Sequence, residues 1–299
     1  MALLIITTIL WAFSFSLIGE YLAGSVDSYF SVLMRVGLAA LVFLPFLRTR
    51  GQSPRTIVLY MLVGAMQLGI MYLLAFRAYL YLTVSEFLLF TVFTPLYITL
   101  IYDLLSGRKL RWGYLLSAAL AVLGAAIIRY DKVSDHFWTG LLLVQLSNLC
   151  FAIGMVGYKR LMEVRPMPQH NAFAWFYVGA FIVAVAAWLM LGNAQKLPTT
   201  TLQWSVLVWL GVVASGLGYF MWNYGATQVD AGTLGIMNNV HVPAGLLVNL
   251  AIWQEQPHWP SFISGALVIL ASLWVHRRWV APHSGQTADD RRRGSAQSE

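Results

Sequence analysis

Residues 91–100 read TVFTPLYITL, and residues 239–248 read NVHVPAGLLV. Each stretch places a proline in the middle of an apolar run about as long as a membrane-spanning helix. Pro95 and Pro243 lack the N–H that a helix needs, and each crowds the carbonyl four residues earlier, which belongs to Thr91 or Asn239. In a membrane an unpaired carbonyl is tolerated mainly where it faces protein or a water-filled cavity. The two stretches therefore predict two interrupted helices beside an internal chamber.

The composition of the whole chain is that of a membrane protein. Of its 299 residues, 59% are hydrophobic and 10% are charged, whereas an ordinary soluble domain has about 25% charged residues. Apolar runs of about 20 residues recur along the chain, and each is long enough to cross the hydrocarbon layer as a helix. We predict an all-α membrane protein with ten membrane-spanning helices, at residues 2–19, 28–47, 56–78, 82–104, 112–129, 138–158, 170–191, 203–224, 231–253 and 260–279.

The basic residues predict how these helices are oriented. Lys and Arg cluster after the second, fourth, sixth and last predicted helices, whereas the opposite loops hold little beyond Lys132 and Lys196. Because cytoplasmic loops are enriched in Lys and Arg, both termini are predicted to be cytoplasmic. The formal charge of +7 is therefore a signal of orientation and does not indicate nucleic-acid binding. The polar residues 281–299 are predicted to form a disordered cytoplasmic tail.

The two halves of the chain resemble each other. Pro243 lies 148 residues after Pro95, and at the same shift Ala78 falls on Ala226. We predict two five-helix repeats, at residues 1–130 and 131–280. Because five is odd, the second repeat must lie inverted in the membrane relative to the first. Inverted repeats are typical of secondary transporters, whose substrate site lies near the middle of the membrane between the repeats.

Several short stretches carry a family resemblance. TILWAF in the first predicted helix, the arginine that opens RVGLAALVFLP in the second, and the paired small-residue and proline helices resemble the EamA-type branch of the drug/metabolite transporter superfamily. The stretches MALLIITTILWAFSFS, NYGATQVDAGTLGIMNN and LASLWVHRRW resemble more closely its biotin-transporting members in enterobacteria. The resemblance implies a multi-pass protein of the bacterial inner membrane that takes up biotin, or a similar carboxylate, by alternating access.

Three charged residues are expected at membrane depth, namely Arg35, Arg77 and Glu86. Charges there are costly and are functional candidates by default. An ion pair between Glu86 and one of the arginines, which would join two helices, is one interpretation. The other is that a guanidinium facing the cavity binds a substrate carboxylate, because its planar fork holds such a group by two hydrogen bonds. Both would hold if Glu86 neutralises the arginine until an anionic substrate replaces it.

Polar and aromatic residues complete the candidate site. Asn238, Asn239 and His241 precede the second proline and offer both donors and acceptors, which suits a neutral polar ring such as a cyclic urea. A hydrogen-bonded contact between helices is the alternative for them. Aromatic walls are typical of small-molecule pockets, although many Trp and Tyr residues of membrane proteins lie at the lipid interface instead. The candidates are Trp11, Tyr72 and Tyr219, with Gln67, Arg77, Trp222 and Asn223 as a second set.

These features favour a secondary transporter of a small organic solute and not an enzyme. The sequence contains no Walker-type loop, no His-Glu-x-x-His pair and no Gly-x-Ser-x-Gly turn, so neither a catalytic residue nor a cofactor is predicted. The remaining histidines lie in loops, helix ends or the tail, and no metal site is predicted. The alternatives are an exporter or importer of amino acids, aromatic acids or other metabolites and drugs, and a channel or membrane scaffold subunit.

Overall fold

The computed structural model describes residues 2–105, 135–229 and 231–254, and some single helical positions between 116 and 127 and between 259 and 278. The described residues form helices and no β-strand. The α-helices are α1 (Ala2–Tyr21), α2 (Ser28–Phe43), α3 (Pro54–Gly64), α4 (Met71–Ala78), α5 (Val84–Thr91), α6 (Thr94–Leu105), α8 (Asp135–Val164), α9 (Gln169–Leu191), α10 (Thr201–Trp209), α11 (Gly218–Thr227) and α12 (Ala231–Val248). The short 3-10 helix η1 (Leu44–Phe46) extends α2, and the π-helices are η2 (Ala65–Ile70), η4 (Leu210–Leu217) and η5 (Asn249–Trp253).

Seven of the described helices, with contiguous segments counted together, are long and apolar enough to cross a membrane. They are Ala2–Tyr21, Ser28–Phe46, Pro54–Ala78, Val84–Tyr102, His136–Val164, Gln169–Leu191 and Thr201–Thr227. A further helical run, made of α12 and η5, matches the ninth predicted helix at 231–253. The predicted helices at 112–129 and 260–279 lie largely outside the described residues, and the predicted tail lies wholly outside them. The all-α class is confirmed for the described part of the chain.

The two prolines differ in their effect on the helices. The helix is interrupted just before Pro95: α5 ends at Thr91, and α6 begins at Thr94. In contrast, α12 is helical on both sides of Pro243, so the interruption predicted there is absent. A proline removes only one backbone hydrogen bond, and membrane helices tolerate this loss when neighbouring groups satisfy the freed carbonyl.

π-Helical segments occur at equivalent places in the two halves. η2 joins α3 to α4 in the third predicted helix, and η4 joins α10 to α11 in the eighth. A π segment inserts extra residues into a helix turn, so it rotates the following side chains and leaves carbonyls open to other donors. The two segments therefore decide which faces of α4 and α11 point inward.

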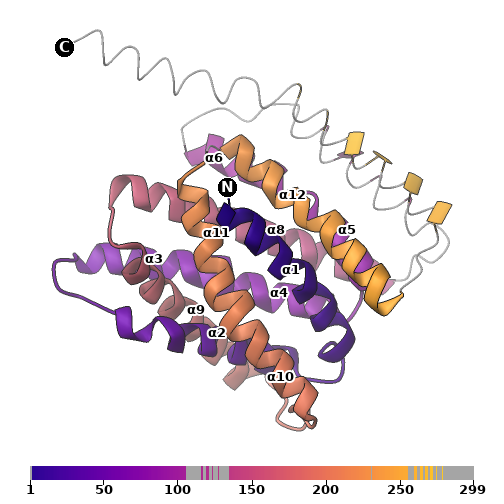
Figure 1. Ribbon diagram of the computed structural model, residues 1–299, viewed down its shortest axis with the longest axis horizontal. Helices are drawn as coiled ribbons and strands as arrows, with labels where there is room; N and C mark the ends of the chain where they lie inside the picture. Colours follow the sequence, from indigo (N-terminus) through magenta and orange to yellow (C-terminus); the bar gives the residue numbers. More distant parts are fainter. Residues whose placement is uncertain are drawn as a thin grey trace.

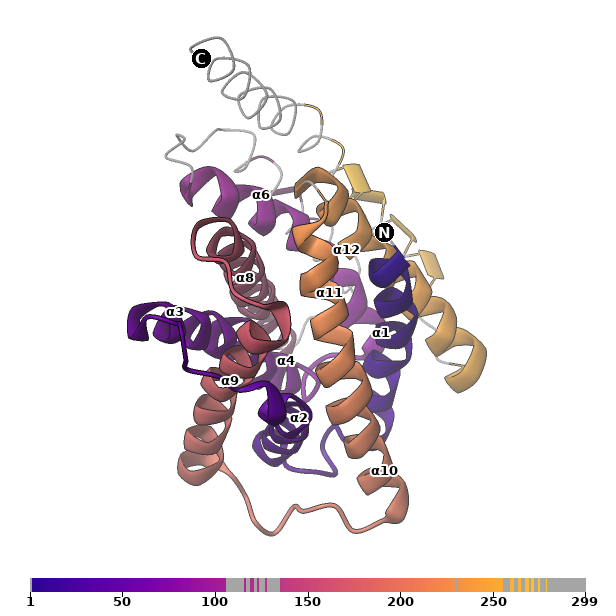
Figure 2. The ribbon, with the colours of Figure 1, turned by 60° about the vertical axis from the view of Figure 1, so that its left-hand side comes forward.

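The packing of the helices is reciprocal between the halves (Figures 1 and 2). α2 packs on α9 and η4, and α9 packs on α2 and η2. Likewise α1 lies along α12, and α8 lies along α6. A close approach joins α3 to α9, where a Cβ atom at Gly64 would lie 1.9 Å from the Phe176 carbonyl oxygen. A Cβ atom at Gly179 would lie 1.9 Å from the Met61 carbonyl oxygen, so only glycine fits at either position.

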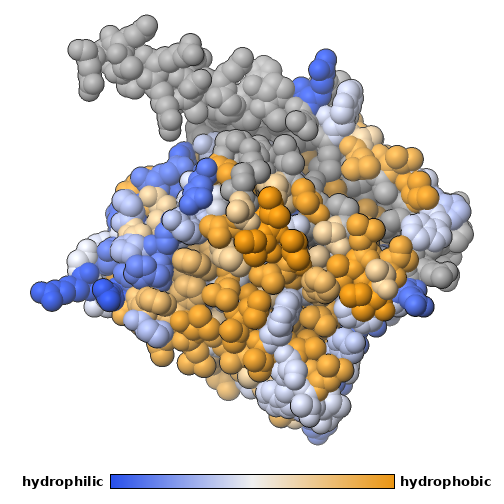
Figure 3. Space-filling model, viewed as in Figure 1, coloured by the Kyte–Doolittle hydropathy of each residue, from blue (hydrophilic) through white to orange (hydrophobic). Residues whose placement is uncertain are grey.

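The surface is apolar over a wide area (Figure 3). Leu41, Leu62 and Leu189 are among the exposed large side chains, with 63%, 60% and 77% of their surface accessible. Exposed apolar area on this scale would be a liability in water, and it is what a lipid-facing surface requires. The loop between α2 and α3, at the left of Figure 1, instead carries the exposed Arg48 and Arg50.

Candidate functional site

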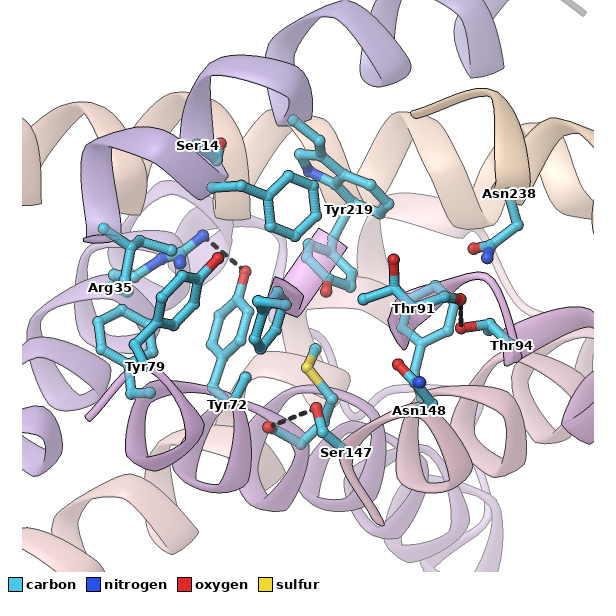
Figure 4. A pocket seen from close by; sticks show the side chains of 18 residues that line it. Ser14, Arg35, Tyr72, Tyr79, Thr91, Thr94, Ser147, Asn148, Tyr219 and Asn238 are labelled. Atoms are coloured by element: carbon cyan, nitrogen blue, oxygen red, sulfur yellow. Dashed lines mark hydrogen bonds between the residues drawn. The ribbon is translucent and has the colours of Figure 1, made fainter. Parts of the chain in front are cut away.

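A cavity lies between helices from both halves of the chain (Figure 4). Its walls come from α1, α2, α4, α5, α6, α8, α11 and α12. It contains about 660 Å³ of empty space, counting the part that is open to solvent. Among the described residues Arg35 is the one charged side chain in the lining, so the cavity has a cationic end and an otherwise neutral wall.

Arg35 forms the cationic end. Its side chain extends from α2 and is only 3% exposed. The Nε atom donates a hydrogen bond to Ser215 Oγ at 3.0 Å, and Nη2 donates to the Tyr72 hydroxyl at 2.8 Å. The Cζ atom lies 4.2 Å from the centre of the Tyr72 ring. In the described part of the chain no carboxylate lies within ion-pair distance of Arg35, so its charge is held by neutral groups alone.

The π-helix η4 places Ser215 against Arg35, and neighbouring helices hold the π-helix. The Tyr177 hydroxyl, from α9, donates to the carbonyl oxygens of Ser215 and Gly216 at 2.7 and 3.0 Å. Trp11 Nε1, from α1, donates to the Ala214 carbonyl oxygen at 3.0 Å. Carbonyls that a π-helix leaves open inside a membrane protein need such donors. The position of the Ser215 hydroxyl thus depends on two neighbouring helices, α9 and α1.

Aromatic rings form the middle of the cavity. The rings of Trp11 and Tyr219 lie 4.6 Å apart between centroids, and Tyr219 meets the Tyr72 ring edge to face at 5.8 Å. Phe151 completes this wall, with its ring 6.2 Å from Tyr219. Such mutually packed rings are rigid and present a broad apolar surface with a few polar tips. This wall suits the apolar part of a small organic molecule.

Hydroxyl and amide groups form the end of the cavity opposite Arg35 (Figure 4). This end lies at the break between α5 and α6. The Thr91 carbonyl oxygen accepts a hydrogen bond from Thr94 Oγ1 at 2.7 Å. The Phe90 carbonyl oxygen accepts from Asn148 Nδ2 at 2.9 Å and from Gln145 Nε2 at 3.3 Å. Side chains of α6 and α8 therefore satisfy the carbonyls that the broken helix exposes.

Asn238, on α12, also lines the polar end. Its side chain is 1% exposed, and its Nδ2 atom has no hydrogen-bond partner among the described residues. Buried amide groups are nearly always hydrogen-bonded, so this donor is unusual. The backbone of α12 is described throughout, but the side chains of Asn239, His241 and Pro243 lie outside the described residues.

Five predicted binding residues line the cavity, and they are Trp11, Arg35, Tyr72, Tyr219 and Asn238. Glu86 is not among the lining residues. Its Oε2 atom accepts from the Thr83 N–H at 2.9 Å, and its own N–H donates to Thr83 Oγ1 at 3.3 Å. This reciprocal pair is a capping box, which satisfies the free N–H groups at the start of α5. Arg77, at the end of α4, instead lies with its Cζ atom 5.8 Å from the centre of the Tyr29 ring.

The other residues of the second set lie away from the cavity, in the contact between the halves. Gln67 Nε2 donates to Asn223 Oδ1 at 2.9 Å, and Asn223 Nδ2 donates to Gln67 Oε1 at 3.0 Å. Both side chains are fully buried. Trp222 is also fully buried, and its Nε1 atom donates to the Met155 sulfur at 3.3 Å. These groups join η2 and α8 to α11.

Several polar residues of the site were not predicted from the sequence. Ser14, Thr91, Thr94, Ser147 and Asn148 line the cavity, and Ser215 bonds Arg35. One signal was available, because Gln145, Ser147 and Asn148 stand close together within an apolar stretch. Single Ser and Thr residues give no such signal, since they often bond the carbonyl one turn earlier in their own helix.

The described residues contain no group of three or more His, Cys, Asp and Glu side chains placed to hold a metal ion. Cys150, on α8, is half-buried and forms no disulfide.

Comparison with known proteins identifies relatives along the whole chain. The model of the EamA-like transporter family matches residues 1–130 and 138–277. A protein of Escherichia coli (strain K12) named biotin transporter is 83% identical over 299 residues, which is 100% of both chains. A probable biotin transporter of Pseudomonas aeruginosa is 56% identical over 279 residues, covering 93% of this chain and 97% of the relative. A solved crystal structure whose description names no activity has the same fold, with a TM-score of 0.64 at 16% identity, over 92% of this chain and 96% of that one.

Proposed function

The chain belongs to the EamA-like transporter family. From the lining of the cavity and the names of the relatives we propose that it takes up biotin, or a closely similar carboxylate, across the bacterial inner membrane. The substrate binds in the cavity between the two halves of the chain. Arg35 holds the substrate carboxylate, while Tyr72 and Ser215 orient the guanidinium. The apolar part of the substrate lies against Trp11 and Tyr219.

The environment of Arg35 is the observation that carries this proposal. The side chain is almost wholly buried and contacts hydroxyl groups and aromatic rings. Burying a charge without an opposite charge costs several kcal/mol, so a protein retains such an arginine for a function. A carboxylate can accept two parallel N–H···O bonds from the fork of a guanidinium. A bound carboxylate would therefore neutralise Arg35 inside the cavity.

The names of the relatives support biotin as the substrate. Biotin carries one carboxylate, an apolar chain with a fused ring system, and a neutral ureido group. The cavity offers one cation, an aromatic middle and a neutral polar end, in an order that matches these three parts. The cavity matches a class of molecules, namely amphipathic monocarboxylates with a polar head. The names of the relatives indicate biotin as the member of this class.

Alternating access of two inverted repeats is the mechanism that we propose. The reciprocal packing of α2 on η4 and α9 on η2 supports a twofold relation between the halves. In inverted-repeat transporters the substrate site lies between the repeats, and rocking of one bundle against the other opens it to each side in turn. Close glycine contacts, such as Gly64 against α9, provide smooth surfaces for such a movement.

Uptake of labelled biotin tests the proposal. The full chain is produced in bacterial cells that lack other routes of biotin entry. We expect saturable uptake and counterflow, with strong competition from biotin and weak competition from its carboxamide, which cannot pair with Arg35. A parallel measurement with a protonophore separates proton-coupled uptake from facilitated exchange.

Other outcomes would identify other functions. Flux that does not saturate would indicate a channel. Saturable transport of an amino acid or an aromatic acid, in either direction and without biotin uptake, would refute the proposed substrate. Full competition by the carboxamide would show that Arg35 does not recognise the substrate carboxylate.

A further inference from the structure

The threonine hydroxyls at the polar end of the cavity already donate to the backbone. Thr91 Oγ1 donates to the Leu88 carbonyl oxygen at 2.7 Å, and Thr94 Oγ1 donates to the Thr91 carbonyl oxygen at 2.7 Å. A hydroxyl has one hydrogen to donate. Both hydrogens are therefore committed to the backbone, and the two hydroxyl oxygens can only accept hydrogen bonds from a molecule in the cavity.

The orientation of Asn148 is fixed by its neighbours. Its Nδ2 atom faces the Phe90 carbonyl oxygen at 2.9 Å and Gln145 Oε1 at 3.4 Å, both of which are acceptors. An amide turned the other way would place two oxygens against each other, so the hydrogen-bond network assigns the nitrogen to that side. Because Asn148 lines the cavity, its Oδ1 atom is a third acceptor for a bound molecule.

Asn238 supplies the donor. Its Nδ2 atom is buried and has no hydrogen-bond partner in the described part of the chain, and the residue lines the cavity. Figure 4 shows Asn238 and Asn148 at the same end of the cavity as Thr91 and Thr94, with Arg35 at the far end. An unpaired buried N–H group costs about 1–3 kcal/mol, and a carbonyl oxygen of a ligand would remove that cost.

We propose that the side chains of Thr91, Thr94, Asn148 and Asn238, called here the head site, recognise a neutral ligand head that has one carbonyl and two N–H groups, which is a cyclic urea. Asn238 Nδ2 donates to the carbonyl oxygen of the head. Asn148 Oδ1 and the threonine hydroxyls accept from its two N–H groups. The inference rests on the proposed function, because it assigns the second end of the same substrate.

The charges of the cavity exclude other heads. No Asp or Glu is among the described residues that line it. A ligand with an ammonium group, such as an amino acid, would have to bury that cation without an anionic partner, which is strongly unfavourable. A second carboxylate at the head site would meet mainly acceptors. The head site therefore selects a monocarboxylate with a neutral head against amino acids and dicarboxylates.

Ligand displacement from the purified full-length protein tests the head site. Displacement of labelled biotin gives the dissociation constant of each ligand, and two ratios of these constants are used. The head preference is the dissociation constant of an analogue in which a hydrocarbon ring replaces the ureido ring, divided by that of biotin. The carboxylate preference is the dissociation constant of biotin carboxamide divided by that of biotin. We expect Asn238→Leu to lower the head preference by about tenfold, because one hydrogen bond is lost, and to leave the carboxylate preference unchanged. Arg35→Lys should lower the carboxylate preference and leave the head preference unchanged.

Asn148→Leu gives a second test with a matched control. We expect it too to lower the head preference. Gln145→Leu also removes a donor to the Phe90 carbonyl, but Gln145 is not among the described residues that line the cavity. The shorter bond from Asn148 Nδ2 to the Phe90 carbonyl oxygen, at 2.9 Å, still orients Asn148 in this variant, so it should keep the wild-type head preference. Ratios of affinities do not depend on the amount of folded protein, so a partly unstable variant still gives an answer.

The outcomes separate this inference from the proposed function. If the wild type binds biotin, and both Asn238→Leu and Asn148→Leu keep its head preference, the head site is refuted and the proposed function stands. A wild type that binds neither biotin nor its analogues refutes both. Loss of head preference in the two variants, without loss of carboxylate preference, supports the assignment.

Discussion

At the scale of single residues, the cavity depends on one cation among neutral groups. Arg35 donates to the hydroxyl groups of Tyr72 and Ser215, and these two hydroxyls are themselves hydrogen-bonded at 2.9 Å. Three groups from α2, α4 and η4 thus fix the plane of the guanidinium. A planar, pre-oriented fork distinguishes arginine from lysine, which is a flexible point charge.

The first prediction concerns Arg35→Lys. A lysine keeps the charge but loses the two-pronged geometry, so we expect initial biotin uptake to fall by at least about tenfold. The amount of protein that is extracted as a monodisperse species from the membrane should change little. Arg77→Lys is the matched control, because Arg77 lies over the Tyr29 ring and is not among the described lining residues. Wild-type uptake by Arg35→Lys would exclude Arg35 as the carboxylate-binding group.

At the scale of helices, the irregular segments are satisfied by side chains of other helices. Tyr177 on α9 and Trp11 on α1 bond carbonyls of η4, and Asn148 and Gln145 on α8 bond the carbonyl exposed where α5 ends. In hydrocarbon an unpaired carbonyl costs several kcal/mol, so each irregularity requires its partner helix. The cavity lies between these irregular segments, with η4 at the Arg35 end and the break between α5 and α6 at the opposite end.

The second prediction concerns the contact between α3 and α9. In Gly64→Ala the new Cβ atom would lie 1.9 Å from the Phe176 carbonyl oxygen, so the two backbones must separate. Such overpacking lowers the free energy of unfolding by about 1–3 kcal/mol or more. Thermal unfolding in detergent measures the loss, and Gly179→Ala should give a similar one.

The matched control for this contact is Gly157→Ala on α8. Its Cβ atom would meet Val63 Cγ2 at 3.2 Å, which is the end of a side chain that can move. Alanine also favours helix over glycine. The control should therefore unfold at the same midpoint temperature as the wild type in detergent. If Gly64→Ala were as stable as Gly157→Ala, the close approach of α3 and α9 would be disproved.

At the scale of the whole molecule, loops from the two halves meet at two ends. The Asp27 N–H donates to the Lys196 carbonyl oxygen at 2.7 Å. At the other end the Arg48 N–H donates to Asn171 Oδ1 at 3.1 Å, and Arg165 Nη1 donates to Thr56 Oγ1 at 3.2 Å. The basic loops that follow α2 and α8 thus lie together. This is the arrangement expected if the predicted cytoplasmic loops share one side of the membrane.

The third prediction concerns the side of the membrane on which the termini lie. Fusions of a fluorescent protein to residue 1 or residue 299 should fluoresce, because the predicted location of both termini is the cytoplasm. Alkaline phosphatase, which is active only after export, should be inactive at both ends and active when inserted in the loop near Lys196. An active phosphatase at just one terminus would contradict the predicted ten helices, since an even number places both ends on one side.

The sequence by itself determined the class of the protein. The positions of the long apolar segments followed from composition and length, because transfer of a helix into hydrocarbon depends on its own residues. Eight of the predicted helices correspond to described helical segments, and the bounds differ by about three residues or fewer except at the end of α8, which continues past the predicted 158 to Val164. The family resemblance is confirmed by the match to the EamA-like transporter family. Arg35 was identified as a candidate for the same local reason, because a charge in an apolar segment is costly wherever the helix packs.

Only the tertiary structure decided which polar residues form the site. Arg35 and Ser215 are 180 residues apart in sequence, and Glu86, equally charged and buried, forms a helix cap instead of lining the cavity. Pro95 accompanies a break, whereas Pro243 lies within a continuous helix. The physical reason is that the direction of a side chain depends on the rotation of its helix. That rotation is set by contacts with distant helices and by the π-helical turns, and neither can be read from the local sequence.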